Sequence, residues 1–425
     1  MASVKKTTSL IHHPYRAPVD FEGPLTAVHK ASTVFFPSVE AMKSRDWKDK
    51  SAYTYGLHGT PTTFTLEERL CAIEGGLHCL LVPSGLAAIA QVNLALLAQG
   101  DEVLLPDNVY GPSKALAQGE LQHWGISHCF YNSLDVEDLA AKITSATRLV
   151  WLEAPGSITM EFPDLVSQVK LCRERGVWCA LDNTWGAGLA FNAFDLTPEQ
   201  GPHPLGVDLT VHALTKYPSG SGDVLMGSII SRDDDLAMRL KLSHMRLGLM
   251  VGANDAESVL RSLPSMAMRY RAQDLSARHL AHWCQEQPAV LQVLHPCLPD
   301  SPGHDHWLRL CTSRAHGDLN PLNESTDAPA GWAAALFSIV IDPQYSTSQV
   351  HQFCEALQFF RLGYSWAGPV SLVVPYELKS LRTVWPAWLR QGHVVRFSIG
   401  LEATVDLQHD LSQAFAAAFS TIPAH

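Results

Sequence analysis

Residues 208–223 read Asp208-Leu209-Thr210-Val211-His212-Ala213-Leu214-Thr215-Lys216-Tyr217-Pro218-Ser219-Gly220-Ser221-Gly222-Asp223. The first half of this run is apolar, as expected for a buried strand, and the second half consists of small, turn-forming residues. The strand would therefore deliver Thr215 and Lys216 to an edge of a sheet, with open space in front of the lysine. The position suits a reactive amine, but an exposed lysine that follows a buried strand would give the same pattern.

Asp182 stands at the end of a second strand-like segment, Val177-Trp178-Cys179-Ala180-Leu181-Asp182. In a parallel sheet the carboxyl ends of the strands meet at one edge, where ligands bind. We therefore expect the carboxylate of Asp182 and the amine of Lys216 to face one crevice. The simpler interpretation is that Asp182 forms a turn or a cap with the polar residues that follow it.

A helix is expected to begin after Pro83-Ser84-Gly85-Leu86, where a short strand turns into an apolar helical segment. The free N–H groups and the dipole at a helix amino terminus favour a phosphate, although Ser-Gly is also an ordinary N-cap. A phosphate-binding turn, an acid and a lysine on one sheet edge are what pyridoxal phosphate requires. In that arrangement Lys216 forms a Schiff base with the cofactor, and Asp182 keeps its ring nitrogen protonated.

Two further residues are candidates for this site. Tyr110 follows a predicted strand and could stack on the cofactor ring, or it could close a loop against the core. Arg396 lies within the apolar segment Val394-Val395-Arg396-Phe397, where a guanidinium needs a partner. Its planar fork suits the α-carboxylate of an amino acid, but a structural ion pair would satisfy it equally well.

Strand and helix patterns alternate between residues 65 and 182. Repeated βα units predict an α/β fold with a mostly parallel sheet and helices on both of its faces. Helical patterns fill residues 234–287, a long surface loop is predicted at 298–331, and a smaller α+β domain follows. We expect an N-terminal arm that contacts a partner subunit at residues 1–64, a cofactor-binding α/β domain at 65–260, and a C-terminal α+β domain at 261–425.

The boundaries of the expected elements follow from the hydrophobic periodicity and the turn residues. Besides the strand before Thr215, the expected strands span residues 79–83, 102–106, 128–131, 148–153, 177–182, 224–230, 335–341, 371–374 and 394–399, and the expected helices span 66–74, 86–98, 113–124, 163–175, 348–359 and 404–419.

The composition of the chain argues against several classes of binding partner. The 425-residue chain has a formal net charge of −11 and no cluster of Lys and Arg, so we expect no nucleic-acid partner. It contains no apolar run of about 18 residues, so we expect no membrane partner. The start lacks the apolar segment of a secretory signal, and the nine cysteines are scattered without a Cys-x-x-Cys pair. We therefore predict a cytoplasmic protein with reduced thiols and no metal site.

Several stretches resemble the Cys/Met-metabolism (transsulfuration) family of pyridoxal phosphate enzymes, which have fold type I, and are most similar to its bacterial cystathionine β-lyase branch. The matching runs cover nearly the whole chain in order: Tyr55-Gly56-Leu57-His58-Gly59-Thr60-Pro61-Thr62, Glu74-Gly75-Gly76, Pro83-Ser84-Gly85, Tyr110-Gly111-Pro112-Ser113, Glu153-Ala154-Pro155-Gly156-Ser157-Ile158-Thr159-Met160-Glu161, Asp182-Asn183-Thr184-Trp185, Thr215-Lys216-Tyr217, Tyr364-Ser365-Trp366 and Arg396-Phe397-Ser398-Ile399-Gly400-Leu401-Glu402. The Pro-Gly-Ser-Ile-Thr-Met-Glu and Tyr-Ser-Trp runs favour the β-lyase branch over γ-lyases and γ-synthases.

The resemblance implies roles for individual residues. It implies that Lys216 holds the cofactor, that Asp182 contacts the pyridine nitrogen and that Tyr110 covers the ring. It implies that the substrate carboxylate is bound by Ser365, Trp366 and Arg396. It implies that the phosphate is bound by Gly85, Leu86 and Thr215, together with Tyr55 of a neighbouring subunit.

The implied reaction is the β-elimination of L-cystathionine, a small amino-acid substrate, by a homodimer or homotetramer with shared active sites. Lyases for cystine or other cysteine S-conjugates, γ-lyases and γ-synthases of the same family, and a non-enzymatic protein that only binds the cofactor remain alternatives. Two departures from many relatives bear on the phosphate: Leu57 stands where they have an arginine, and Ala213 where they have a serine. We therefore expect weaker retention of the cofactor.

Overall fold

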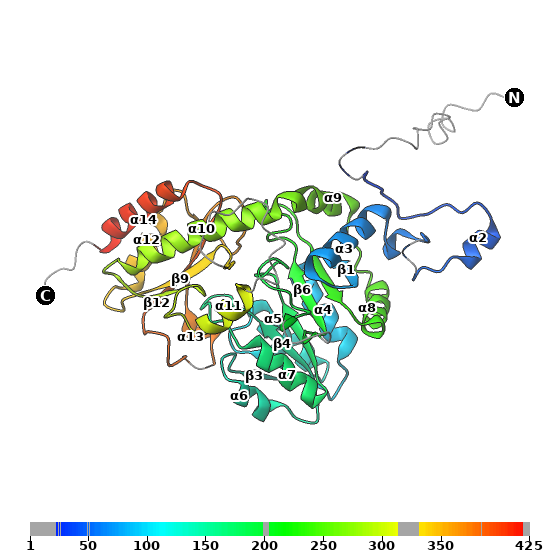
Figure 1. Ribbon diagram of the computed structural model, residues 1–425, viewed down its shortest axis with the longest axis horizontal. Coiled ribbons are helices and arrows are strands. Elements are labelled where there is room, and N and C mark those ends of the chain that lie inside the picture. Colours follow the sequence, from blue (N-terminus) through cyan, green and yellow to red (C-terminus); the bar gives the residue numbers. More distant parts are fainter. Residues whose placement is uncertain are drawn as a thin grey trace.

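The computed structural model describes residues 23, 25, 27–48, 50, 52–198, 204–312, 331–383 and 385–419. Two β-sheets lie side by side, and the long helix α10 (Met266–Gln285) runs from the larger sheet to the smaller one (Figure 1). Among the helices of these residues, none combines the length and the apolar character needed to cross a membrane.

The larger sheet has seven strands in the order β1-β7-β6-β5-β4-β2-β3. Strand β7 runs antiparallel to both of its neighbours, and the remaining strand pairs are parallel, which confirms the predicted, mostly parallel sheet. The strands are β1 (His78–Val82), β2 (Glu102–Pro106), β3 (Ser127–Tyr131), β4 (Thr147–Glu153), β5 (Trp178–Asp182), β6 (Leu209–Ala213) and β7 (Gly227–Ser231).

Helices cover both faces of this sheet because successive strand residues point to opposite sides. Val103 and Leu105 pack in the core under one set of helices, whereas Leu104 packs in the core under the other set. The first set comprises α4 (Gly85–Leu96), α5 (Gly111–Leu116) with the π-helical turn Ala117–Leu121, and α8 (Asp234–Leu247); the second comprises α3 (Pro61–Glu74), α7 (Leu165–Arg175) and α9 (Ala253–Ser262).

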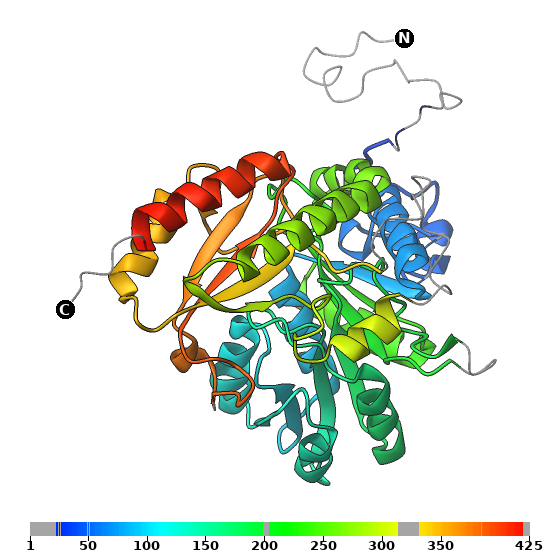
Figure 2. The same cartoon turned by 60° about the vertical axis from the view of Figure 1, so that its left-hand side comes forward.

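The smaller sheet has five strands in the order β10-β11-β12-β9-β8. Helices α10 and α14 lie side by side over its strands (Figure 2), and Phe337, Phe353, Phe397 and Phe415 fill the core between them. The elements are β8 (Val290–Leu294), β9 (Leu336–Ile341), α12 (Thr347–Ala356), β10 (Arg361–Leu362), β11 (Leu372–Tyr376), α13 (Leu378–Leu381), β12 (His393–Ser398) and α14 (Thr404–Phe419).

The predicted loop at 298–331 is wrong in its first part, because α11 (His304–Cys311) lies there. This short helix buries Trp307, Leu310 and Cys311 between polar segments that mask its periodicity. Residues 313–330 lie outside the described part of the chain. The structure also contains β8 and α6 (Val136–Lys142), which the sequence patterns did not indicate.

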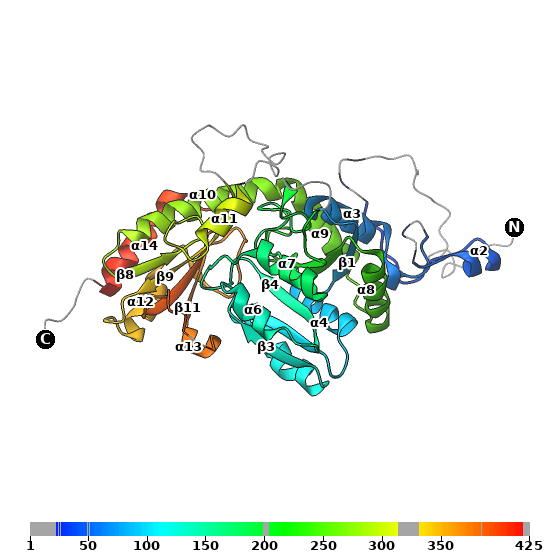
Figure 3. The ribbon, with the colours of Figure 1, turned by 60° about the horizontal axis from the view of Figure 1, so that its bottom comes forward.

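The N-terminal arm, within its described residues, places the segment 39–44 away from the two sheets (Figure 3). It carries α2 (Val39–Ser44), which buries none of its residues, and the 3-10 turn Gly56–His58. A second 3-10 turn, Leu263–Ser265, joins α9 to α10. The expected helix at 66–74 begins earlier, at Pro61, because Thr60 caps it and proline suits the first helical turn.

Candidate active site

Asp182 and Lys216 lie near each other at the carboxyl ends of two neighbouring strands. Asp182 is the last residue of β5, and its position in the ladder is opposite Val211 of β6. Strand β6 ends at Ala213, three residues before Lys216. The charge of each group shifts the pKa of the other, so the structure brings the predicted acid and amine together.

The amine of Lys216 is partly buried and held in place. Its Nζ donates a hydrogen bond to Oγ of Ser365 at 2.8 Å and lies 5.5 Å from the centre of the Trp366 ring. Burial, followed by the positive charge of Arg396, lowers the pKa of Lys216 to about 8, and the charge of Asp182 opposes this shift. The amine is therefore neutral far more often near pH 7 than an ordinary lysine is, and in that form it can accept a proton or attack a carbonyl.

Two donors fix the carboxylate of Asp182. The backbone N–H and the hydroxyl of Thr184 donate to its Oδ1 at 3.1 and 2.5 Å. Burial raises the pKa of Asp182, while the Thr184 hydrogen bonds and the charges of His212 and Lys216 favour the ionised form. The Thr184 hydroxyl also accepts a hydrogen bond from the N–H of Ala213 at 2.9 Å, which ties the ends of β5 and β6 together.

Arg396 lies on β12 of the smaller sheet and is 6% exposed. Its Nη1 donates to the carbonyl of Ser157 at 3.0 Å, and its guanidinium lies 5.2 Å from the centre of the Tyr376 ring. Burial lowers its pKa. Within the described residues no carboxylate lies at ion-pair distance from it, so the structural ion pair considered above is not formed there. A buried guanidinium of this kind can bind an anionic ligand.

Tyr110 precedes α5 and is 42% exposed, so its ring does not close a loop inside the core. Burial raises the pKa of its phenol, and the charges of Asp182 and Glu153 raise it further. The tyrosine therefore stays protonated while it lies within electrostatic reach of both acids. Glu153 is a buried residue to which the sequence patterns assigned no role, and the carboxylate at the end of a buried strand was the available signal.

The amino terminus of α4 is closely packed against β6. Ser84 caps this helix by accepting the N–H of Ala87 at 3.0 Å, and the N–H groups of Gly85 and Leu86 precede the first intrahelical hydrogen bond. A Cβ at position 85 would lie 2.7 Å from the Cβ of Ala213, so only glycine allows this approach. The hydroxyl of Thr215 already bonds the backbone of Met226, accepting its N–H at 3.2 Å.

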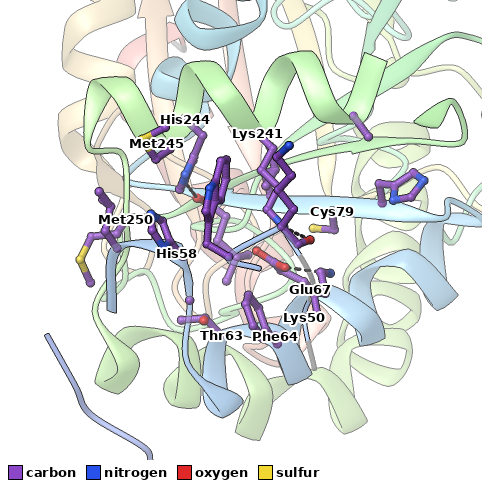
Figure 4. Close-up of a pocket in the computed structure, with 18 of the residues that line it drawn as sticks. Lys50, His58, Thr63, Phe64, Glu67, Cys79, Lys241, His244, Met245 and Met250 are labelled. Atoms are coloured by element: carbon purple, nitrogen blue, oxygen red, sulfur yellow. Dashed lines mark hydrogen bonds and ion pairs between the residues drawn. The ribbon is translucent and has the colours of Figure 1, made fainter. Parts of the chain in front are cut away.

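Tyr55 and Leu57 lie elsewhere, on the N-terminal arm. Tyr55 is 48% exposed and pairs with Thr33 in an isolated β-bridge. Its ring is edge-on to the ring of His58, with the two ring centres 6.4 Å apart. Leu57 lines a cavity of about 360 Å³ between the arm, α3, β1 and α8, around which Figure 4 shows His58, Glu67 and Lys241. The lining of this cavity includes neither Lys216 nor Asp182.

These groups fit pyridoxal phosphate. The amine of Lys216 could condense with its aldehyde, and the carboxylate of Asp182, which Thr184 holds by hydrogen bonds, could bind its ring nitrogen. The amino terminus of α4, where Gly85 allows a close approach to β6, could bind its phosphate. Among the described residues, no group of His, Cys, Asp or Glu side chains could hold a metal ion.

Comparison with known proteins gives a consistent result. The family model of the Cys/Met metabolism PLP-dependent enzymes matches residues 7–319. A Rhizobium johnstonii protein, provisionally named cystathionine β-lyase, is 37% identical over 94% of this chain and 93% of its own length. Cystathionine β-lyase MetC of Escherichia coli K12 is 31% identical, over 98% and 99%.

A solved structure adds to these sequence matches. The structure of cystathionine γ-synthase from Xanthomonas oryzae pv. oryzae, in complex with cystathionine, matches with a TM-score of 0.78 at 25% identity, over 94% of both chains. The fold is therefore PLP fold type I, as predicted, and the cofactor is pyridoxal phosphate. The chain belongs to the Cys/Met metabolism family of PLP-dependent enzymes.

Proposed function

We propose that the protein catalyses the β-elimination of L-cystathionine to homocysteine, pyruvate and ammonia. The near full-length similarity to relatives named cystathionine β-lyase supports this reaction over the γ-directed reactions of the same family. The Pro-Gly-Ser-Ile-Thr-Met-Glu run at 155–161 and the Tyr-Ser-Trp run at 364–366 support the same branch.

The observation that carries the proposal is the environment of Arg396. This residue is buried, and among the described residues it contacts the carbonyl of Ser157 and the ring of Tyr376 rather than an acid. Its positive charge also lowers the pKa of Lys216, so the guanidinium and the amine lie close enough to contact the same small ligand. An amino acid whose α-carboxylate is bound by Arg396 would therefore present its Cα to the Lys216 amine.

When bound, pyridoxal phosphate supplies an aldehyde that condenses with amines and a ring that stabilises negative charge at Cα. Asp182 would hold a negative charge toward the ring nitrogen, and Tyr110 would cover the ring. The Lys216 amine would remove the Cα proton, because its lowered pKa makes the neutral form more available than in an ordinary lysine, and Lys216 or Tyr110 would return a proton to the departing sulfur.

Ser365 and Trp366 complete the substrate side in this proposal. The hydroxyl of Ser365, which accepts a hydrogen bond from Lys216, would help to bind the α-carboxylate, and Trp366 would form a wall of the pocket. The N–H groups of Gly85 and Leu86, together with Thr215, would bind the phosphate, and Tyr55 would reach it from a second copy of the chain. The exposed position of Tyr55 on the arm supports that arrangement.

One experiment separates the candidate reactions. Purified protein loaded with pyridoxal phosphate is incubated with L-cystathionine, and both the free thiol and the keto acid are identified. Homocysteine with pyruvate is the expected result. Cysteine with 2-oxobutyrate would indicate γ-elimination, and release of neither thiol would refute a lyase acting on cystathionine.

A further inference from the structure

A second carboxylate ends the strand beside β5. Glu153 is the last residue of β4, and the parallel ladder places it directly opposite Asp182. Residues paired in this way point to the same face of the sheet. Glu153 is 7% exposed, and the reaction described above gives it no task.

The two oxygens of Glu153 contact two different segments of the site. Its Oε2 accepts the backbone N–H of Tyr110 at 2.9 Å. Its Oε1 forms a short hydrogen bond with the hydroxyl of Ser157. The carbonyl of Ser157 in turn accepts a hydrogen bond from Arg396 at 3.0 Å. One side chain therefore links the strand next to Asp182 with the tyrosine and, through Ser157, with the buried guanidinium.

We propose that Glu153 is a positioning residue, which holds Tyr110 and, through Ser157, Arg396 in register with Asp182. The proposal rests on the proposed function in taking Tyr110 and Arg396 as ligand-facing groups. It does not depend on which bond of the substrate is broken, because it concerns where the ligand is held.

The charge of Glu153 follows from its surroundings. Burial, and then the charge of Asp182, raise the pKa of Glu153 to about 8. The ionisable groups that act on it or are affected by it are Asp182 on β5, Tyr110 and Tyr131, while Arg396 contacts it through Ser157. The charges of His212 and Lys216 favour the ionised form of Asp182, and Glu153 is the less exposed of the two acids, so the proton resides on Glu153 at neutral pH.

A neutral acid has consequences for both neighbours. Glu153 can accept the Tyr110 N–H with one oxygen and share its own proton with Ser157 through the other. Asp182 then remains the single anion of the pair, which matches the single positive charge of a protonated ring nitrogen. A glutamine has the same shape with one acceptor and one donor group, whereas an alanine leaves the N–H of Tyr110 and the hydroxyl of Ser157 without this partner.

The test measures binding, with glycine as a probe that has no group to eliminate. Glycine is titrated into the cofactor-loaded protein, and its dissociation constant is read from the visible absorbance of the bound cofactor. The dissociation constant of pyridoxal phosphate itself is measured with the apoprotein. We expect Glu153→Ala to weaken glycine binding by about tenfold or more and to weaken cofactor binding, because a buried donor loses its acceptor. Glu153→Gln should stay within about twofold of the unchanged protein.

Two further variants keep the test decisive. Asp410 is a buried carboxylate of α14 that accepts the N–H groups of Gln358 and Phe359, neither of which is assigned to the site, so Asp410→Asn controls for the loss of a buried acid in general. Should Glu153→Ala fail to fold, Ser157→Ala removes the hydroxyl that contacts Glu153 but keeps the carbonyl that contacts Arg396. Ser157→Ala should weaken glycine binding while Asp410→Asn leaves it unchanged.

The pH dependence distinguishes positioning from simple stability. Glycine affinity of the unchanged protein should fall as the pH rises through about 8, where Glu153 ionises, and Glu153→Gln should lack that part of the decrease. Lys216 has a pKa in the same range but is common to both proteins, so the difference between the profiles reports Glu153. Identical profiles, unchanged glycine affinity in Glu153→Ala, or equal losses in Glu153→Gln and Glu153→Ala would each overturn the proposal. The yield of pyruvate or 2-oxobutyrate does not enter these measurements, so a failed reaction assignment would be recognised separately.

Discussion

Arg396→Ala should reduce kcat/KM for an amino-acid substrate by on the order of 100-fold. A charge-assisted hydrogen bond from a buried guanidinium contributes up to about 3 kcal/mol, which corresponds to roughly two powers of ten. The folded protein should not become less stable, because the substitution removes a cation whose burial is unfavourable and which no carboxylate of the described residues offsets. The loss should therefore appear in kcat/KM with an unchanged or higher Tm.

The assay follows keto acid formation at substrate concentrations below KM, with Tm measured in parallel. Arg396→Lys should recover little activity, because an ammonium group cannot present two parallel donors to a carboxylate. Arg390, which is exposed and precedes the same strand, provides the matched control, and Arg390→Ala should leave kcat/KM unchanged. Retention of kcat/KM within about threefold in a cofactor-loaded Arg396→Ala protein would show that the carboxylate binds elsewhere.

Three other substitutions test separate parts of the structure. Lys216→Ala should abolish turnover and the visible absorbance band of bound cofactor together, and pyruvate formation by this variant would contradict the assignment. Leu57→Arg should slow the loss of pyridoxal phosphate during dialysis, because it adds a cation on the arm that is proposed to reach the phosphate, and an unchanged rate of loss would argue against that contact. Asp274→Ala should lower the free energy of unfolding by about 3–5 kcal/mol, measured by denaturant titration. The reason is that Arg271 and Arg278 are buried and donate hydrogen bonds to this carboxylate at 2.8 and 2.7 Å. A loss below about 1 kcal/mol would show that this buried ion pair does not stabilise the fold.

The sequence predicted those parts of the structure that depend on local pattern. Alternating strand and helix segments indicate a parallel sheet, and a parallel sheet collects the ends of its strands at one edge. The approach of Asp182 to Lys216 could therefore be predicted without knowledge of any long-range contact. Helix α14 was predicted with its observed bounds, because a continuous amphipathic run of 16 residues leaves little ambiguity.

Features that depend on which segments become neighbours could not be predicted in this way. The pKa of Glu153 depends on β4 lying next to β5, and the alternation of elements does not state the order of strands in a sheet. The contact of Arg396 with the Ser157 carbonyl joins residues 239 positions apart. The direction of β7, antiparallel to its neighbours, likewise follows from how its connection crosses the sheet rather than from its own residues.

Substrate binding should itself change the proton affinity of the Lys216 amine. The charge of Arg396 lowers the pKa of Lys216 toward about 8. A carboxylate bound to Arg396 offsets that charge, so the pKa of Lys216 should rise when the ligand is in place. The neutral fraction of the amine would then be larger in the free site, and the amine would become a stronger base once the carboxylate is bound.

This coupling can be measured with the apoprotein, in which the rate of pyridoxal phosphate uptake follows the neutral fraction of Lys216. Propionate serves as the carboxylate, and the uptake rate is recorded against pH with and without it. Since a raised pKa means that the amine loses its proton at higher pH, propionate should move the midpoint of the profile upward from about 8. Arg396→Ala should shift the midpoint upward by itself and make it insensitive to propionate. A midpoint that propionate leaves unchanged in the protein with Arg396 would mean that the guanidinium and the amine are not coupled through a bound carboxylate.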